Sequence, residues 1–290
     1  MLENLTSWLF ETGAVRVCPQ DRPFWYTSGT IGPYYINTHF LYGSEIKANE
    51  LLAFIDREKS GILSLPVKVL EETRKNYRED PIYRGLMDGM IDFIRKNLDI
   101  DQVAYISGGE RRDWFFSLLA ADILQKPHIT IYKDLKTVLT MDGRTEELKD
   151  LKEGRVLHIA DLINEASSYE RAWIPAIRAK NGSLDWSVVV VDRKQGGGEL
   201  LAQNGVLSLA MVEIGKSLFE SALSLGKINK EQYAMIADYL KDPKTAMRNF
   251  MLAHPGFLKD SLAGDPKTRE RAELCIRQDF YGLKDSAPEI

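Results

Sequence analysis

The sequence of 290 residues contains few residues that could hold a metal ion through sulfur or imidazole. It has two cysteines, Cys18 and Cys275, and four histidines. The cysteines fit no zinc or redox spacing and the histidines show no metal-ligand spacing, so we expect no protein-held metal site. We expect both cysteines to be free thiols in a reducing compartment. His158 falls inside a strand pattern, which favours a hydrogen-bonded core histidine over a ligand.

The chain also lacks long hydrophobic runs and an excess of positive charge. No run of eighteen apolar residues occurs, and Glu3 stands where a secretory signal would have a basic start. We therefore expect a cytoplasmic protein with no membrane partner. The formal net charge of -4 is unlike that of a dedicated nucleic-acid-binding protein, so we expect no nucleic-acid partner. A composition of 44% hydrophobic and 28% charged residues is typical of a globular protein with a substantial core.

The stretch from Val156 to Ser168 contains the most informative pattern in the chain. A short apolar run ends in an acid, a short loop follows, and a helical pattern starts near Tyr169. This layout is typical of a strand that leads into a loop at the edge of a parallel sheet, where the next helix can receive a phosphate on its first N–H groups. Asp161 could bind ribose hydroxyls or, through water, a metal. An ordinary strand-to-helix junction capped by Ser167 or Ser168 is the alternative.

Two further strand patterns are followed by polar residues. Val103 to Ser107 is a buried-strand pattern, and Gly108 to Arg112 lies between it and a helical pattern. Glycines and arginines at a helix start can form an anion-binding nest, because arginine pairs bidentately with phosphate. A solvated turn with basic side chains is the alternative. Val188 to Val191 is typical of a strand covered on both faces, and Asp192 and Arg193 follow it, where they could also simply pair.

The stretch from Phe24 to Asn37 combines aromatic residues, hydroxyls and turn-forming glycines. Such a cluster suits a planar ligand, since a ring can stack on the aromatic side chains while backbone groups bind its edges. A hairpin that packs its aromatic residues into the core is equally compatible with the pattern.

Four stretches, in this order, resemble motifs of the orotate phosphoribosyltransferases, members of the type I phosphoribosyltransferase family. The N-terminal aromatic stretch resembles the family's hood, and five positions match as they stand: Ser28, Gly29, Pro33, Tyr34 and Asn37. Gly108 to Arg112 stands at the place of the pyrophosphate loop, with Arg111 at the position of a lysine. Val156 to Ser168 resembles the phosphoribosyl-pyrophosphate loop. Asp192 to Gly197 resembles the family's Asp-Arg-x-Glu-Gly-Gly, in which the arginine binds the orotate carboxylate.

The resemblance implies an α/β fold of the type I phosphoribosyltransferase kind, with a parallel sheet, helices on both faces, an N-terminal hood and a helical C-terminal extension. It covers residues 1–218, with a helical insertion at about 56–85, and leaves residues 219–290 as the extension. Apolar residues of the extension, such as Met247 and Phe250, recur at helical intervals and are expected to bury against the insertion or a second subunit.

The resemblance also implies transfer of ribose 5-phosphate from phosphoribosyl pyrophosphate to orotate or a related base, through an oxocarbenium-like transition state stabilised by placed charges. The base would be held by Arg193 and by the backbone of Tyr35 and Ile36. The pyrophosphate would be held by Gly108, Gly109, Arg111, Lys133 and Lys136. The ribose and its phosphate would be held by Asp161, Asn164, Ser167 and Ser168. Lys133, Lys136 and Asp161 are the expected catalytic residues, and Mg²⁺ would offset the pyrophosphate charge.

Several residues depart from the family's pattern and predict impaired or altered activity. Thr27 replaces a lysine, and Ala160 leaves a single acid, which is a poor Mg²⁺ site. Glu165 adds negative charge near the expected phosphate, in a loop without glycine. The alternative is a non-catalytic subunit that binds a base or nucleotide or has a regulatory role. Because the family's mobile loop acts across a dimer, we expect a homodimer, and the chain could lend its lysines to a competent partner.

Overall fold

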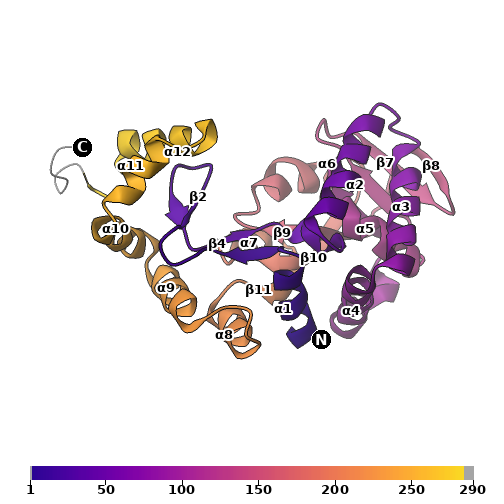
Figure 1. Cartoon of the computed structure of the whole chain (residues 1–290). Coiled ribbons are helices and arrows are strands. Elements are labelled where there is room, and N and C mark those ends of the chain that lie inside the picture. The colour runs from indigo at the N-terminus through magenta and orange to yellow at the C-terminus, as the bar shows by residue number, and fades with distance from the viewer. Residues whose placement is uncertain (1, 284–290) are drawn as a thin grey trace. The chain divides into compact units, whose positions relative to one another are not determined.

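The computed structural model describes residues 2–283, and the chain folds into two compact units (Figure 1). The first unit comprises Met1–Ala14 and Asn37–Ile214, and the second comprises Val15–Ile36 and Gly215–Ile290. One break lies close to the expected boundary at residue 218. The segment expected to form the hood groups with the C-terminal extension and not with the sheet. None of the described helices is both long and apolar enough to cross a membrane.

The first unit is built on a seven-stranded sheet with the order β11-β10-β9-β5-β6-β7-β8. Its strands are β5 (Tyr105–Gly109), β6 (His128–Ile131), β7 (Thr137–Met141), β8 (Arg144–Glu147), β9 (Arg155–Ile163), β10 (Ser183–Asp192) and β11 (Leu207–Glu213). The five strands from β11 to β6 pair in parallel, whereas β7 and β8 add an antiparallel hairpin. The expected parallel sheet is confirmed for these five strands, and the sheet as a whole is mixed.

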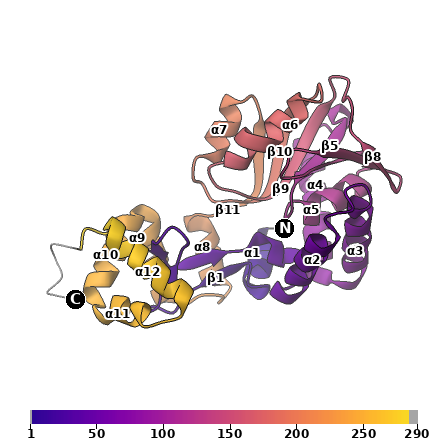
Figure 2. The ribbon, with the colours of Figure 1, turned by 90° about the horizontal axis from the view of Figure 1, so that it is seen from above.

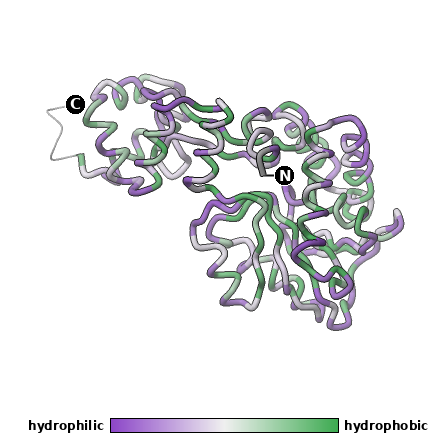
Figure 3. The backbone as a smooth tube through the Cα atoms, turned by 90° about the horizontal axis from the view of Figure 1, so that it is seen from below, coloured by the Kyte–Doolittle hydropathy of each residue, from purple (hydrophilic) through white to green (hydrophobic). Residues whose placement is uncertain are grey.

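Strand β9, which holds the central sequence pattern, lies between β10 and β5. It is hydrophobic along most of its length because helices cover both faces of a parallel sheet of this kind. Val156 and Ala160 join the core on one face. Figure 3 shows the strands of this sheet mostly in the hydrophobic colour.

Helices cover both faces of the sheet (Figure 2). One face carries α7 (Gly197–Gln203), α6 (Ile174–Arg178) and the π-helical turn η3 (Tyr169–Trp173). Helix α5 (Trp114–Ile123) covers the other face, and the remaining helical elements of this unit are α1 (Leu2–Glu11), η1 (Thr38–Tyr42), α2 (Glu45–Glu58), α3 (Leu65–Glu79), α4 (Pro81–Asn97) and η2 (Ile100–Gln102). The helical pattern expected from near Tyr169 is present as η3 continued directly by α6, and Pro175 lies in the first turn of α6.

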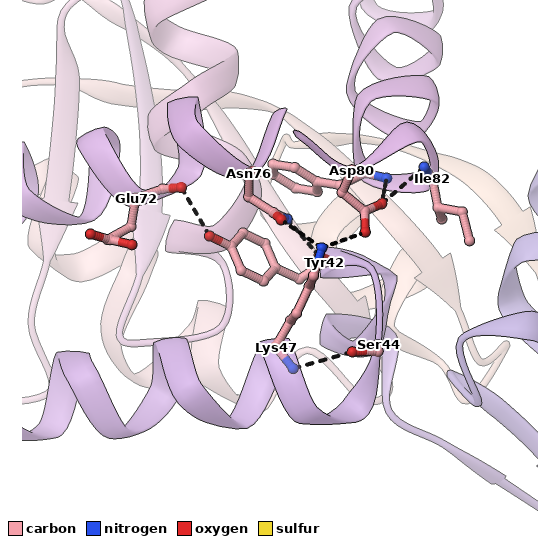
Figure 4. A network of polar contacts seen from close by, with 8 residues as sticks. Tyr42, Ser44, Lys47, Glu72, Asn76, Asp80 and Ile82 are labelled. Carbon is pink, nitrogen blue, oxygen red and sulfur yellow. Dashed lines mark hydrogen bonds and ion pairs between the residues drawn. The ribbon is translucent and has the colours of Figure 1, made fainter. Parts of the chain in front are cut away.

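A network of polar contacts joins η1, α2, α3 and α4 (Figure 4). Lys47 Nζ on α2 lies 2.8 Å from Asp80 Oδ2 and 3.3 Å from Asn76 Oδ1. Asp80 also caps α4, and the Ser44 hydroxyl caps α2 by accepting a hydrogen bond from the N–H of Lys47. Gly43 has φ +122°, and a Cβ there would lie 2.3 Å from the Asp80 carboxylate. Helix α2 is thus fixed at its N-terminus to α3 and to the N-cap of α4.

The second unit consists of four short strands and five helices. The strands β1 (Val15–Val17) and β4 (Tyr34–Ile36) form one antiparallel pair, and β2 (Phe24–Trp25) and β3 (Ile31–Gly32) form another. The helices are α8 (Lys216–Ser224), α9 (Lys230–Lys241), α10 (Pro243–Ala253), α11 (Gly256–Leu262) and α12 (Pro266–Gln278).

The core of the second unit forms between its strands and its helices. Trp25 is buried, stacks on Phe257 with ring centroids 5.6 Å apart, and donates from Nε1 to the Ser261 hydroxyl at 2.9 Å. Met247 and Phe250 belong to the same buried cluster. The expectation that these two side chains bury against the helical insertion or a second subunit is therefore wrong, because the aromatic strand segment covers them. The aromatic residues of that segment serve packing at Trp25 and also at Tyr34, which is buried.

Candidate functional site

The carboxyl ends of β5 and β9 border a cavity of about 570 Å³. The two strands are parallel neighbours, so the loops that follow them meet at one edge of the sheet. The residues that line the cavity include Glu110 to Asp113 after β5, Lys133 after β6, Ala160 to Tyr169 around the end of β9, Trp173, and Gln195 after β10. The central sequence stretch therefore opens into a cavity large enough for a small ligand.

Six of the site residues predicted from sequence line this cavity: Arg111, Lys133, Asp161, Asn164, Ser167 and Ser168. Gly108 and Gly109 end β5 just before it. Lys136 and Arg193 are not among the described lining residues, although Gln195, two positions after Arg193, is. The backbone N–H of Arg193 donates to the carbonyl of Ile163 at 3.0 Å, which holds the start of its loop beside β9.

The remaining two predicted residues, Tyr35 and Ile36, belong to β4 of the second unit. Both are paired in register with β1, Tyr35 with Arg16 and Ile36 with Val15. The Tyr35 side chain is exposed, and its ring lies 6.2 Å from that of Phe24.

The carboxylate of Asp113 connects the two loops that border the cavity. Its Oδ2 accepts a hydrogen bond from the N–H of Gly109 at 3.0 Å, and its Oδ1 accepts one from the N–H of Asp161 at 3.1 Å. Asp113 occupies the N-cap position of α5 but makes no side-chain capping bond there. Its carboxylate is used instead to join the end of β5 to the end of β9.

Asp161 is buried at the cavity wall, and its pKa is raised from 3.8 to about 8. Burial is the larger cause, because desolvation penalises the charged carboxylate, and the nearby charge of Asp113 adds to it. The positive charge of Arg112 acts in the opposite direction. A carboxyl group that retains its proton at neutral pH can donate as well as accept a hydrogen bond to a ligand hydroxyl.

The loop from Asn164 to Ser168 presents backbone N–H groups that have no partner in the fold. Within residues 2–283, none of these five N–H groups donates a hydrogen bond. Ala166 adopts a positive φ of 56° despite the absence of glycine from the loop. Ser168 precedes η3 without making a side-chain cap, so a simple capped junction at this serine is wrong. Unpaired N–H groups at the start of a helical turn are suited to an anion.

The predicted cations around the cavity differ in what they contact. Arg111 forms an ion pair with Asp56 on α2 and also donates to the carbonyl of Leu52 at 3.4 Å. Lys136 pairs with Asp134 at 2.9 Å. The Lys133 backbone N–H is held by Glu110 Oε2 at 2.9 Å, and its side chain lines the cavity. Lys133 is thus the predicted cation most available to a ligand.

Aromatic rings pack beneath the end of β5. The His158 ring is buried between Tyr169 and Trp173, with centroid distances of 4.9 Å and 6.0 Å. Its Nδ1 lies 2.9 Å from the Ser107 hydroxyl, while its Nε2 lies 3.4 Å from Asp113 Oδ2 without forming a hydrogen bond. His158 is the expected core histidine, hydrogen-bonded at only one of its two nitrogens.

The described residues do not assemble a metal centre. No group of three or more His, Cys, Asp or Glu side chains within residues 2–283 could hold a metal ion. Asp161 is also a poor ligand because its pKa is raised, so its carboxylate is not the charged form that Mg²⁺ prefers. The side chains of the described part of the chain therefore do not fit a protein-held Mg²⁺.

The sequence interpretation missed three residues that shape this site. Asp113 looked like a residue at a helix start, and only the pairing of β5 with β9 brings it to both loops. Trp173 lay within an expected helix, and Asp56 lay at the edge of an expected insertion. No sequence signal distinguished the last two, because their partners are distant in the chain.

Comparison with solved structures relates the fold to known proteins. The chain is similar to UMP synthase from Leishmania donovani, with a TM-score of 0.53 and 17% identity over 82% of this chain and 42% of that one. It is similar to orotate phosphoribosyltransferase from Francisella tularensis, with a TM-score of 0.50 and 13% identity over 80% of this chain and 95% of that one. This chain therefore has the type I phosphoribosyltransferase-like fold that its sequence predicts. It spans less than half the length of the UMP synthase. No family model and no curated protein matches the sequence.

Proposed function

We propose that this chain is a divergent orotate phosphoribosyltransferase-like protein that binds a phosphorylated ribose ligand in the cavity at the ends of β5 and β9. In this proposal, transfer of ribose 5-phosphate from phosphoribosyl pyrophosphate to orotate or a related base is slower than transfer at a site that keeps the family's pattern. The observation that carries the proposal is the set of five unpaired backbone N–H groups, from Asn164 to Ser168, along the wall of a cavity of about 570 Å³.

The residues of the cavity have distinct proposed roles. The N–H groups of the loop and the hydroxyls of Ser167 and Ser168 bind the 5-phosphate, as neutral donors that converge on an anion. Asp161 contacts the ribose hydroxyls. Lys133 and Arg112 face the pyrophosphate and stabilise the negative charge that develops on it in the transition state. The base would contact Arg193, as the resemblance implies.

Three observations support reduced transfer. Arg111 is engaged by Asp56, so one cation expected at the pyrophosphate is already neutralised. Glu110 and Glu165 both line the cavity, and each adds negative charge near a polyanionic ligand. Lys136 is paired with Asp134 and does not line the described cavity. Any Mg²⁺ would enter with the pyrophosphate, since residues 2–283 offer no carboxylate cluster for it.

Calorimetry on the full chain tests the proposal. Ribose 5-phosphate, phosphoribosyl pyrophosphate with Mg²⁺, and orotate are titrated separately, and product formation is followed by the loss of orotate absorbance. We expect both ribose phosphates to bind and turnover to be slow. The S167A/S168A double variant should weaken ribose 5-phosphate roughly tenfold, because two hydrogen bonds to a charged group are lost. The matched control is S183A. Ser183 is exposed at the start of β10, whereas the cavity is lined by Gln195, which follows the other end of the same strand. The absence of ribose phosphate binding would contradict the proposal.

A non-catalytic binding or regulatory subunit is the second candidate, and the Arg111–Asp56 pair favours it because that pair removes a cation from the pyrophosphate side. Ribose phosphate binding without detectable product would support this candidate.

We also propose that the protein is a cytoplasmic homodimer. Sedimentation equilibrium of the purified chain tests the dimer. The chain can also be mixed with an orotate phosphoribosyltransferase variant that is inactive because it lacks its own loop lysine. Recovery of activity in the mixture would indicate that this chain lends lysines to a partner.

A further inference from the structure

The ion pair between Arg111 and Asp56 lies beside the cavity and involves a helix that the sequence did not connect to the site. Arg111 is in the loop after β5 and lines the cavity. Its Nη1 donates to the carboxylate of Asp56 and to the carbonyl of Leu52, both on α2. Since both acceptors belong to the same helix, the guanidinium is directed at α2.

Helix α2 is positioned firmly enough to act as an anchor. Its apolar face is buried through Ala48, Leu51, Leu52 and Ile55. Its first turn is held by the Ser44 cap and by the contacts of Lys47 with Asp80 and Asn76 (Figure 4). Asp56 is therefore presented to Arg111 by an element fixed at its start and along its buried face.

The charges around the cavity make the position of Arg111 consequential. The ionisable lining residues are three cations, Arg111, Arg112 and Lys133, and four acids, Glu110, Asp113, Glu165 and Asp161, of which Asp161 is held neutral by its raised pKa. Once Asp56 neutralises Arg111, two cations remain to face a ligand. A single phosphate can be bound by these cations and by the neutral N–H groups of the loop. A diphosphate adds further negative charge to a cavity that already has more acids than free cations.

We infer that Asp56 is a specificity-determining residue, which makes the cavity favour ribosyl ligands with a single phosphate over phosphoribosyl pyrophosphate by retaining Arg111 on α2. This inference rests on the proposed binding of a phosphorylated ribose. A diphosphate ligand must first release Arg111 from Asp56. The pair is partly exposed, with 28% of the Arg111 and 53% of the Asp56 side chain accessible. Such pairs are weak, so the contact selects between ligands and does not block the cavity.

The test compares ribose 5-phosphate with phosphoribosyl pyrophosphate by calorimetry on the full chain. D56N removes the charge and keeps the side-chain shape. We expect it to raise the affinity for phosphoribosyl pyrophosphate roughly fivefold, because Arg111 becomes available and one repelling charge is lost. Its affinity for ribose 5-phosphate should stay within about twofold of the original. In an R111Q background, D56N should lose most of its effect on the ratio of the two affinities.

D122N is the matched control, since Asp122 forms a comparable partly exposed pair with Arg74 and does not line this cavity. It should leave both affinities unchanged. If ribose 5-phosphate binds but D56N alters both affinities equally, or neither, the inference is overturned while the proposed function stands. If neither ligand binds the original chain or any variant, the proposed function fails, and the inference fails with it.

Discussion

Oδ1 of Asp113 accepts a hydrogen bond from the backbone N–H of Asp161 at 3.1 Å, and this bond joins the loop after β5 to the end of β9. The other oxygen of the same carboxylate accepts from the N–H of Gly109 at 3.0 Å. One buried side chain thus fixes two edges of the cavity relative to each other. The relationship gives Asp113 a structural role, although it places two carboxylates close together in a buried site.

Replacing Asp113 should destabilise the first unit. D113A leaves the N–H groups of Gly109 and Asp161 without an acceptor, and we expect a loss of about 2–4 kcal/mol in the free energy of unfolding. D113N keeps an acceptor oxygen and should lose about 1–2 kcal/mol. Urea unfolding measures both. D122N removes an acid on the surface of the same helix and serves as the control, with an expected loss of at most about 1 kcal/mol. Equal losses in D113A and D122N would argue against the bridging role.

Stability should fall as the pH rises, because of Asp161. Its carboxyl group ionises near pH 3.8 when exposed, whereas burial and Asp113 raise its folded pKa to about 8. The favourable contribution of the protonated Asp161 carboxyl group to the free energy of unfolding is complete below pH 3.8 and is lost as the pH rises through 8. D161N cannot ionise and should lose less stability over this range. Between pH 5 and pH 8, the free energy of unfolding of D161N should rise by about 1–3 kcal/mol relative to that of the original chain, as measured by urea unfolding. Parallel pH profiles for the two proteins would contradict the raised pKa.

Adding a methyl group at Gly109 should disturb the site. A Cβ at this position would lie 2.2 Å from Cζ2 of Trp173, so the indole must move. We expect G109A to cost about 2–3 kcal/mol and to change the tryptophan fluorescence. G198A is the control, because a Cβ at Gly198 in the first turn of α7 meets open space. That variant should be neutral or gain about 0.5 kcal/mol. Unchanged fluorescence in G109A would mean that Trp173 does not pack on β5.

The core of the second unit should depend on Trp25. W25A removes a buried stacked ring, and we expect a loss of about 3–5 kcal/mol from the unfolding free energy of this unit. S261A keeps the ring but removes the partner of the indole N–H and the hydrogen bond from Ser261 to the carbonyl of Phe257, and it should cost about 1 kcal/mol. Hydrogen exchange resolved by segment can assign the loss to α10, α11 and α12. If W25A instead loosens only the strands β2 and β3, the ring does not support the helices.

Particular residues show how far sequence patterns predict this site. The apolar run ending at Asp161 and the β-branched run before Asp192 predicted two buried strands, because buried parallel strands need continuous hydrophobic residues. The loop residues Asn164, Ser167 and Ser168 and the cations Arg111 and Lys133 were predicted near a ligand, and they line one cavity. Lys136 was grouped with them by the family resemblance, but its side chain pairs with Asp134.

The sequence by itself predicted the α/β fold and the main strands, because these follow from local hydrophobic patterns and motif order. The phosphate site at the end of β9 stays a prediction. Only the tertiary structure decided that Asp113 bridges two loops, that Asp56 holds Arg111 and that Trp25 packs among the C-terminal helices. These contacts join residues that are distant in the chain or belong to different elements. Local patterns carry no record of such pairs, since their energies depend on which surfaces the completed fold brings together.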